Sequence, residues 1–217
     1  MSRDDWFRRT TWSSDDEAAF FARLDRCRSV GNKSQYVRIQ AITLMETGIL
    51  DPAIMLLDKV INDWPDKIEM ASTHLALAEC YGKLREPDLA VKHFRLALEA
   101  ETVMPNVLTR AWLEYPLFVL SNRLTSLYDE IEHVISSREL DRHVSFPIEE
   151  YQLSAVKALL SDYRGQYSVA KIWAVQAIEA ANRNHSGFRY HAKLGLVSNP
   201  GGPIHEQVVE IANRPSQ

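Results

Sequence analysis

Residues 69–105 read EMASTHLALAECYGKLREPDLAVKHFRLALEAETVMP, and this stretch decides the fold. Small and apolar side chains recur in it at the spacing of one helix face. They are Leu77, Ala78 and Tyr81 before position 87, and Ala90, Phe94 and Ala97 after it. Pro87 lies between the two groups and cannot continue a regular helix. The stretch therefore predicts two helices that approach closely at their alanines, with Tyr81 and Phe94 filling the space beside them.

The same pattern recurs along the chain. A step of 37 residues back from Ala78 reaches a matching set, made up of Ala41, Leu44, Ala53, Leu57 and Val60. A step of 37 forward reaches a weaker set, apolar but without the small residues: Tyr115, Phe118, Leu127, Ile131 and Val134. A clearer last set contains Ala158, Gly165, Ala170, Ala174 and Ala177. Four helix pairs are predicted, at 34–67, 71–104, 108–141 and 151–184; the third, which contains Pro116, is a degenerate repeat or an atypical helical hairpin.

The spacing Leu77-Ala78-x2-Tyr81-x8-Ala90-x3-Phe94-x2-Ala97 resembles a tetratricopeptide repeat. The resemblance covers most of the chain and implies an all-α fold, a right-handed superhelical solenoid of antiparallel helix pairs. The step of 37 exceeds the 34 residues usual for this family, and the excess fits in the 64–69 connection. Ser161, at the position of Tyr81, departs from the family pattern.

The two ends of the chain differ from the repeats. Residues 1–33 are expected to form an N-terminal arm and a capping helix. Ser14 opens a capping box, the helix runs to about Arg28, and Val30-Gly31-Asn32 ends it. The arm carries Trp6, Phe7 and Trp12, which predict packing over the end of the core, although a partner-binding arm is the alternative. Residues 185–217 are expected to form a C-terminal capping tail that seals the other end.

Composition excludes several classes of protein. The chain has 217 residues, 46% of them apolar, and a net charge of −4 that argues against nucleic-acid binding. Its two cysteines, Cys27 and Cys80, are expected to be free thiols. The N-terminus does not read as a secretory signal, and no stretch is apolar enough for a membrane span. We therefore expect a cytoplasmic protein without membrane contact, a monomer or weak dimer.

The sequence contains none of the common catalytic motifs. The phosphate-binding, dinucleotide-binding, nucleophile-elbow and HExxH motifs are all absent, and so is any pair of CxxC motifs. No enzyme activity, catalytic residue, metal or cofactor is predicted. One alternative stays open, a metal-binding or catalytic protein that uses the histidines of the 185–205 tail, His185, His191 and His205.

The resemblance also implies where a partner would bind. In tetratricopeptide proteins the first helix of each pair lines the concave face of the solenoid, at residues that point away from the packing stripe. With Arg189 of the tail, the candidate partner-binding residues are Gln35, Arg38, Ser72, Glu79, Lys83, Trp112, Gln152 and Asp162. Apolar neighbours on the same face are Ile42, Met45, Leu75 and Leu159, and Thr109 joins them. Trp112 would be the anchor, unless it is buried in the core.

The predicted function is non-catalytic recognition of a protein or peptide in the concave groove. A carboxylate clamp is doubtful, because only Arg38 and Lys83 supply positive charge to this face. A sharper alternative is a dedicated inhibitor, such as an immunity protein that neutralises a bacterial toxin, since an acidic surface complements a basic nuclease. A secretion-type chaperone is similar in size and repeat content.

Overall fold

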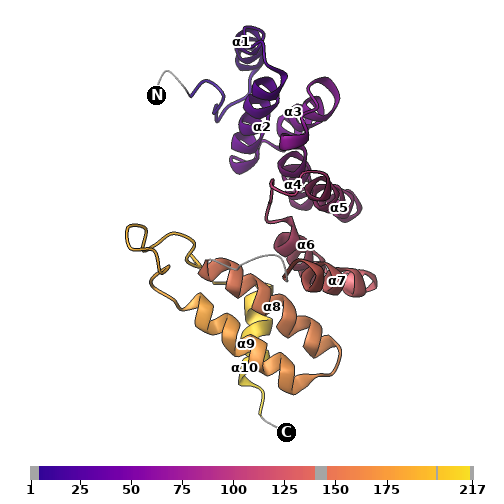
Figure 1. Cartoon of the computed structure of the whole chain (residues 1–217), viewed down its shortest axis with the longest axis vertical. Helices are drawn as coiled ribbons and strands as arrows, with labels where there is room; N and C mark the ends of the chain where they lie inside the picture. The colour runs from indigo at the N-terminus through magenta and orange to yellow at the C-terminus, as the bar shows by residue number, and fades with distance from the viewer. Residues whose placement is uncertain (1–4, 140–145, 199, 216–217) are drawn as a thin grey trace. The chain divides into compact units, whose positions relative to one another are not determined.

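The computed structural model describes residues 5–139, 146–198 and 200–215, and it confirms the all-α class. These residues form ten α-helices and one 3-10 turn, and no strand occurs among them (Figure 1). The elements are α1 Ser14–Leu24, α2 Val30–Glu46, α3 Leu50–Asp63, α4 Lys67–Lys83, α5 Pro87–Val103, α6 Ala111–Ser121, η1 Thr125–Leu127, α7 Tyr128–Glu139, α8 Pro147–Tyr163, α9 Tyr167–Ala181 and α10 Pro203–Asn213.

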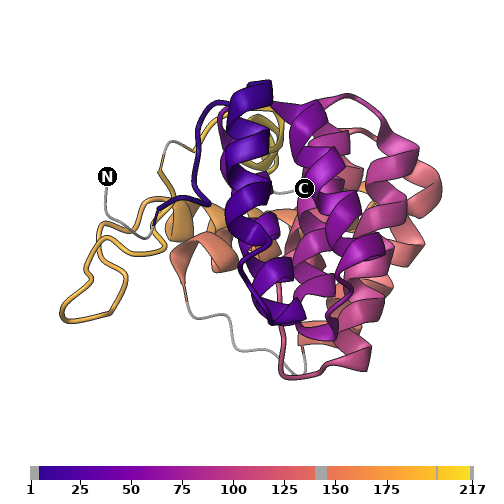
Figure 2. The same cartoon turned by 90° about the horizontal axis from the view of Figure 1, so that it is seen from above.

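The chain divides into two compact units, one up to Ala111 and one from Trp112 onward. In the first unit α2 packs on α3 and α4 packs on α5, and α4 also contacts both α2 and α3 (Figures 1 and 2). Its core contains the residues of the repeat pattern, and Leu77, Ala78 and Ala90 are fully buried. Phe94 is buried too, whereas Tyr81 is half-buried and its ring stacks on His93 at 5.4 Å between centroids.

The same turn ends the first helix in all four predicted ranges. One residue near the turn has a positive φ each time, namely Gly48, Arg85, Arg123 and Gly165. The next backbone N–H then donates to a carbonyl five residues back, and the bonds are Ile49 to Leu44, Glu86 to Tyr81, Leu124 to Val119 and Gln166 to Ser161, all 2.9 to 3.0 Å. This is the hydrogen bond of a Schellman helix end. The first three turns are 37 and 38 residues apart, so the third pair shares the local geometry despite its weaker pattern.

The N-terminal arm packs against the first unit. Gln40 is fully buried, and its side chain accepts from Arg9 N–H at 2.8 Å and donates to the Arg9 carbonyl at 2.7 Å. The Trp6 ring lies 5.2 Å from the rings of Phe20 and Tyr36. The arm is thus held by both polar and aromatic contacts.

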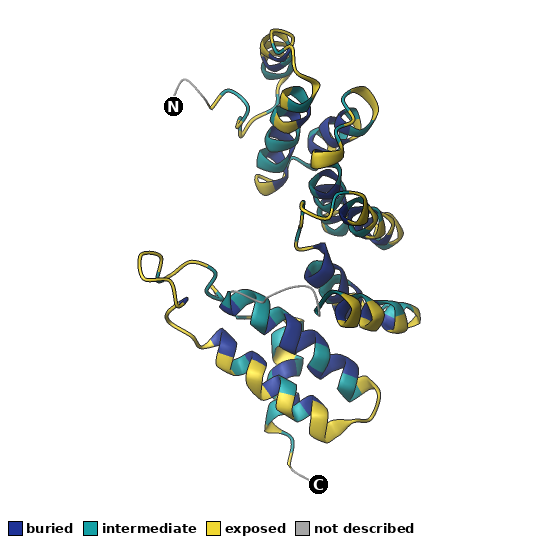
Figure 3. Ribbon diagram, viewed as in Figure 1, coloured by how far each residue is buried: buried dark blue, intermediate teal, exposed yellow. Residues whose placement is uncertain are grey.

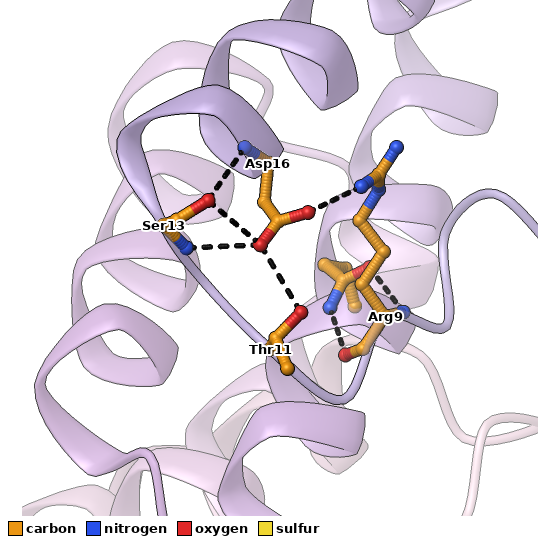
Figure 4. A network of polar contacts seen from close by, with 5 residues as sticks. Arg9, Thr11, Ser13 and Asp16 are labelled. Atoms are coloured by element: carbon orange, nitrogen blue, oxygen red, sulfur yellow. Dashed lines mark hydrogen bonds and ion pairs between the residues drawn. The ribbon is translucent and has the colours of Figure 1, made fainter.

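The cap of α1 is one residue earlier than predicted. Ser13, not Ser14, is the N-cap, because its Oγ accepts from Asp16 N–H while Asp16 Oδ2 accepts from Ser13 N–H at 3.0 Å (Figure 4). Hydrogen bonds from the Ser13 backbone and hydroxyl lower the pKa of Asp16 to about 2. The predicted extent of this helix was also wrong, since α1 ends at Leu24 rather than near Arg28. Residues 30–32, expected to end it, form the first turn of α2, which is capped by Ser29.

In the second unit α8 and α9 form a close antiparallel pair, and α10 packs on both. The face of α9 toward this core consists of small side chains, since Ala170, Ala174 and Ala177 are fully buried. Tyr115 of α6 donates to Glu130 of α7 at 2.6 Å. The segment after α9 is held at the start of α8, where Ile148 N–H donates to the Gly195 carbonyl at 2.9 Å.

Candidate functional site

A hollow of about 360 Å³ lies in the first unit, beside the first helices of its two pairs. Helix α2 contributes Arg38, Ile42, Met45 and Glu46, and α4 contributes Ser72, Leu75, Ala76 and Glu79. The segment between α5 and α6 closes it with Leu108, Thr109 and Arg110. The structure thus brings together three candidate residues, Arg38, Ser72 and Glu79, with four of their predicted neighbours, Ile42, Met45, Leu75 and Thr109.

An ion pair joins α2 to α4 at this hollow. Arg38 Nε donates to Glu69 Oε2, and both side chains are largely buried. A buried carboxylate is costly unless a cation and hydrogen bonds satisfy it, so the pair holds the two helices at a set separation. Arg38 is therefore bound to a partner within the chain. This arrangement weakens further the idea that Arg38 clamps a free carboxylate.

A second buried carboxylate positions the segment after α5. Glu101 is 1% exposed, and its Oε1 accepts from Thr109 N–H at 2.7 Å and from Thr109 Oγ1 at 2.6 Å. Thr109 Oγ1 in turn accepts from Ala111 N–H at 3.1 Å, where α6 begins. Hydrogen bonds to a charged group are the stronger class. They hold residues 108–110 at the rim of the hollow, where the Leu108 side chain is exposed.

The lining is chemically mixed. Ile42, Met45 and Leu75 offer an apolar surface in which a partner's side chain can be desolvated. Glu46, Glu79 and Arg110 add charge of both signs beside it. Such a lining suits an amphipathic segment, with apolar side chains turned inward and polar groups at the edge.

Two histidines and a tyrosine form a cluster between α4 and α5. His74 Nδ1 and His93 Nδ1 are 3.1 Å apart, a hydrogen bond in which one neutral ring donates and the other accepts. Burial lowers the pKa of His93 to about 4, with further contributions from His74 and Lys92. Burial also lowers the pKa of His74 and raises that of the Tyr81 hydroxyl. These shifts are those of a neutral, packed interface between the two helices.

Other candidate residues lie outside the hollow. Gln35 and Lys83 are exposed in the first unit but do not line it. Trp112 is 4% exposed, so its ring is not accessible as an anchor, and its burial favours the core alternative that the sequence left open.

The remaining candidates belong to the second unit. Gln152 is half-buried on α8, and Asp162 forms an ion pair with Arg214. Arg189 is exposed in the tail and lies over the Tyr190 ring at 5.4 Å. None of these three residues lines the hollow beside α2 and α4.

The sequence left open that the histidines of the C-terminal tail bind a metal or take part in catalysis. His185 and His191 are exposed, whereas the half-buried His205 has its Nδ1 3.3 Å from the Tyr151 hydroxyl. Within the described ranges, no group of three or more His, Cys, Asp or Glu side chains could hold a metal ion.

Sequence reasoning missed several residues that shape the hollow. Glu46, Leu108 and Arg110 line it, and Glu69 and Glu101 position its parts. Glu101 continues the packing stripe of Phe94 and Ala97 at the spacing of one helix face, so the register already indicated its burial. Glu69 likewise shares a buried face with Thr73 and Ala76. Their partners, 31 and 8 residues away, could not be read from that spacing. For the rim residues Leu108 and Arg110 the available signal was the breaker Pro105, because it predicts a connection in which exposed residues can be presented.

None of the described helices is long and apolar enough to cross a membrane. Comparison with known proteins found no family model, no curated protein and no solved structure that matches this chain.

Proposed function

We propose that this chain is a non-catalytic protein-interaction module of the helical-repeat kind, and that it binds a segment of a partner protein in the hollow between α2 and α4. The observation that carries the proposal is the lining itself. Residues that the repeat register assigns to the binding face, Arg38, Ser72 and Glu79, line one hollow together with apolar side chains.

The arrangement of the chain as a tetratricopeptide-like, right-handed solenoid is part of the same proposal. The repeated helix hairpin within it is supported by the four first helices, which all end with a positive φ and a Schellman hydrogen bond. In such a repeat the first helices face the groove, a role that α2 and α4 would fill in this chain.

The chemistry of the hollow suggests the kind of partner segment. Ile42, Met45 and Leu75 would receive one or two apolar side chains, and Arg110, Glu46 and Glu79 would meet polar groups beside them. We therefore expect an amphipathic helix or extended peptide rather than a C-terminal carboxylate alone.

The test uses two matched variants with the same substitution at equally exposed leucines. Leu108→Asp changes the rim of the hollow, and Leu194→Asp changes the tail of the second unit; the two side chains are 56% and 53% exposed. Each variant should melt at the wild-type temperature, since neither side chain is in a core. Both are used with wild type as baits in a native lysate.

The partner captured by wild type is then purified and titrated calorimetrically. We expect one-to-one binding without chemical change of the partner, a loss of about tenfold or more for Leu108→Asp, and little change for Leu194→Asp. Equal affinity for all three baits would contradict binding in this hollow. The partner's identity would separate an inhibitor of a basic toxin from a secretion-type chaperone or an adaptor.

A further inference from the structure

Helix α9 is apolar on two opposite faces. The face with Ala170, Ala174 and Ala177 packs into the core, whereas the opposite face presents Val169, Ile172 and Val175 to solvent, and Ile172 is 58% exposed. In Figure 3 buried and exposed colours alternate along α9. These three side chains border a hollow of about 780 Å³, whose lining includes Tyr167, Glu179 and Arg214. A continuous exposed apolar surface on one helix is typical of a protein interface.

The order of apolar and polar residue types along the exposed stripe is symmetric about Ile172. The residues three positions before and three positions after it are both valine, Val169 and Val175. Four positions before and after it are Ser168 and Gln176, both polar. All of them lie on one face, because helix neighbours are three and four residues apart. A stripe with this symmetry is complementary to its own copy when the two helices run antiparallel.

We propose that this face of α9 is the interface of a homodimer, in which α9 of a second copy packs antiparallel about a two-fold axis at Ile172. Each Ile172 then contacts its own counterpart, and each Val169 lies level with the partner's Val175. Such an isologous contact uses the same patch on both subunits.

Charge at the two ends of the stripe supports a second copy as the occupant. Arg214 lies at the N-terminal end, where its guanidinium is 5.1 Å from the Tyr167 ring centre and pairs with Asp162. Glu179 is exposed near the C-terminal end, seven residues or about 10 Å along the axis from Ile172. Antiparallel pairing brings each Glu179 to the partner's Arg214 end, and also to the positive end of the partner's helix dipole. The apolar centre and the charged ends therefore match in the same register.

The dimer should be weak, because one helix face is smaller than the roughly 800 Å² per partner of a standard stable interface. Sedimentation velocity of the full chain from about 1 μM to 1 mM should show a monomer–dimer equilibrium in that range. Ile172→Asp should leave only monomer even at the highest concentration. The matched control is Ile68→Asp, at an isoleucine 54% exposed in the first unit, and it should dimerise as wild type does.

Two results would overturn the proposal: wild type that stays monomeric throughout, or a dimer that persists in Ile172→Asp. A wild type that stays monomeric would indicate that a different protein, not a second copy, covers the stripe. Glu179→Lys should weaken the dimer several-fold, because two equivalent exposed ion pairs are lost.

Disulfide trapping tests the antiparallel register. In a Cys27→Ser background, with the buried Cys80 retained, Ile172→Cys should cross-link to itself on mild oxidation. Val169→Cys should cross-link with Val175→Cys in a mixture but not with itself, because its own counterpart lies about 9 Å further along the axis. Self-linking of Val169→Cys as fast as the mixed pair would contradict an antiparallel contact. Ile172→Asp should not change binding in the α2–α4 hollow, so the two proposals fail separately.

Discussion

At the scale of single residues, buried polar groups hold the non-helical segments of the first unit against its helices. The Gln40 side chain holds the N-terminal arm through hydrogen bonds with the backbone N–H and carbonyl of Arg9. The Glu101 carboxylate holds the segment before α6 through the N–H and hydroxyl of Thr109. A buried polar group that loses its partner keeps the cost of its desolvation. Each of these contacts therefore favours one arrangement over its alternatives, which general hydrophobic burial cannot do.

Glu101→Ala should destabilise the fold by about 2–4 kcal/mol, since it removes two hydrogen bonds to a buried carboxylate and orphans their donors. The control is Glu99→Ala, which removes an exposed carboxylate from the same helix and should cost less than about 0.5 kcal/mol. Urea unfolding measures both. Equal small effects would mean that Glu101 does not hold the segment.

The paired histidines predict a loss of stability in mild acid. The pKa of His93 is about 4 in the folded chain, against an unfolded value of 6.5. The unfolded chain therefore takes up the proton first, so stability is full above pH 6.5 and is lost as the pH falls toward 4. We expect the free energy of unfolding to fall by about 1–3 kcal/mol across this window.

Urea unfolding at several pH values measures this dependence, with a His74→Phe/His93→Phe variant as control. Carboxylates titrate in both proteins, so the difference between the two curves isolates the histidines. Parallel curves would contradict the assignment of neutral rings at this contact.

At the scale of elements, the turn after each first helix is the repeated feature. Gly48 and Gly165 adopt a positive φ that glycine accepts without strain, whereas Arg85 and Arg123 adopt it with a side chain. The Schellman hydrogen bond is nevertheless present at all four sites. The turn geometry is therefore kept even where the residue type disfavours a positive φ.

Opposite substitutions at two equivalent turns should have opposite effects. Arg85→Gly should stabilise the fold by about 0.5–1 kcal/mol, because it relieves the strain of a positive φ. Gly48→Ala should destabilise it by about 1 kcal/mol or more, and by strain alone, since a Cβ there would meet nothing within 4 Å. Thermal unfolding of the two variants measures both changes. A loss of stability in Arg85→Gly would mean that the Arg85 side chain makes a compensating contact.

At the scale of the whole molecule, the chain consists of two compact units, each with a core of its own. Leu44, Leu57 and Leu77 are among the fully buried side chains of the first unit, and Ala158, Ala170 and Ala174 are among those of the second. Different cores allow different local stabilities within one chain.

Leu57→Ala should therefore destabilise the first unit and leave the second unit unchanged. The cavity that it leaves should destabilise the first unit by about 2–5 kcal/mol. Amide hydrogen exchange should become faster in α2 to α5 and stay unchanged in α8 and α9. Equal acceleration in both units would mean that the whole chain opens as one cooperative body.

Much of this molecule follows from the sequence by itself. The spacing of alanines and large apolar residues predicted the helix pairs, because helix periodicity acts between residues a few positions apart. Only the tertiary structure decided which partners the carboxylates of Glu69 and Glu101 meet. It also decided that Leu108 and Arg110 reach the hollow and that Trp112 is covered. Those outcomes depend on contacts between residues far apart in the chain, such as Arg38 with Glu69, and no local pattern contains them.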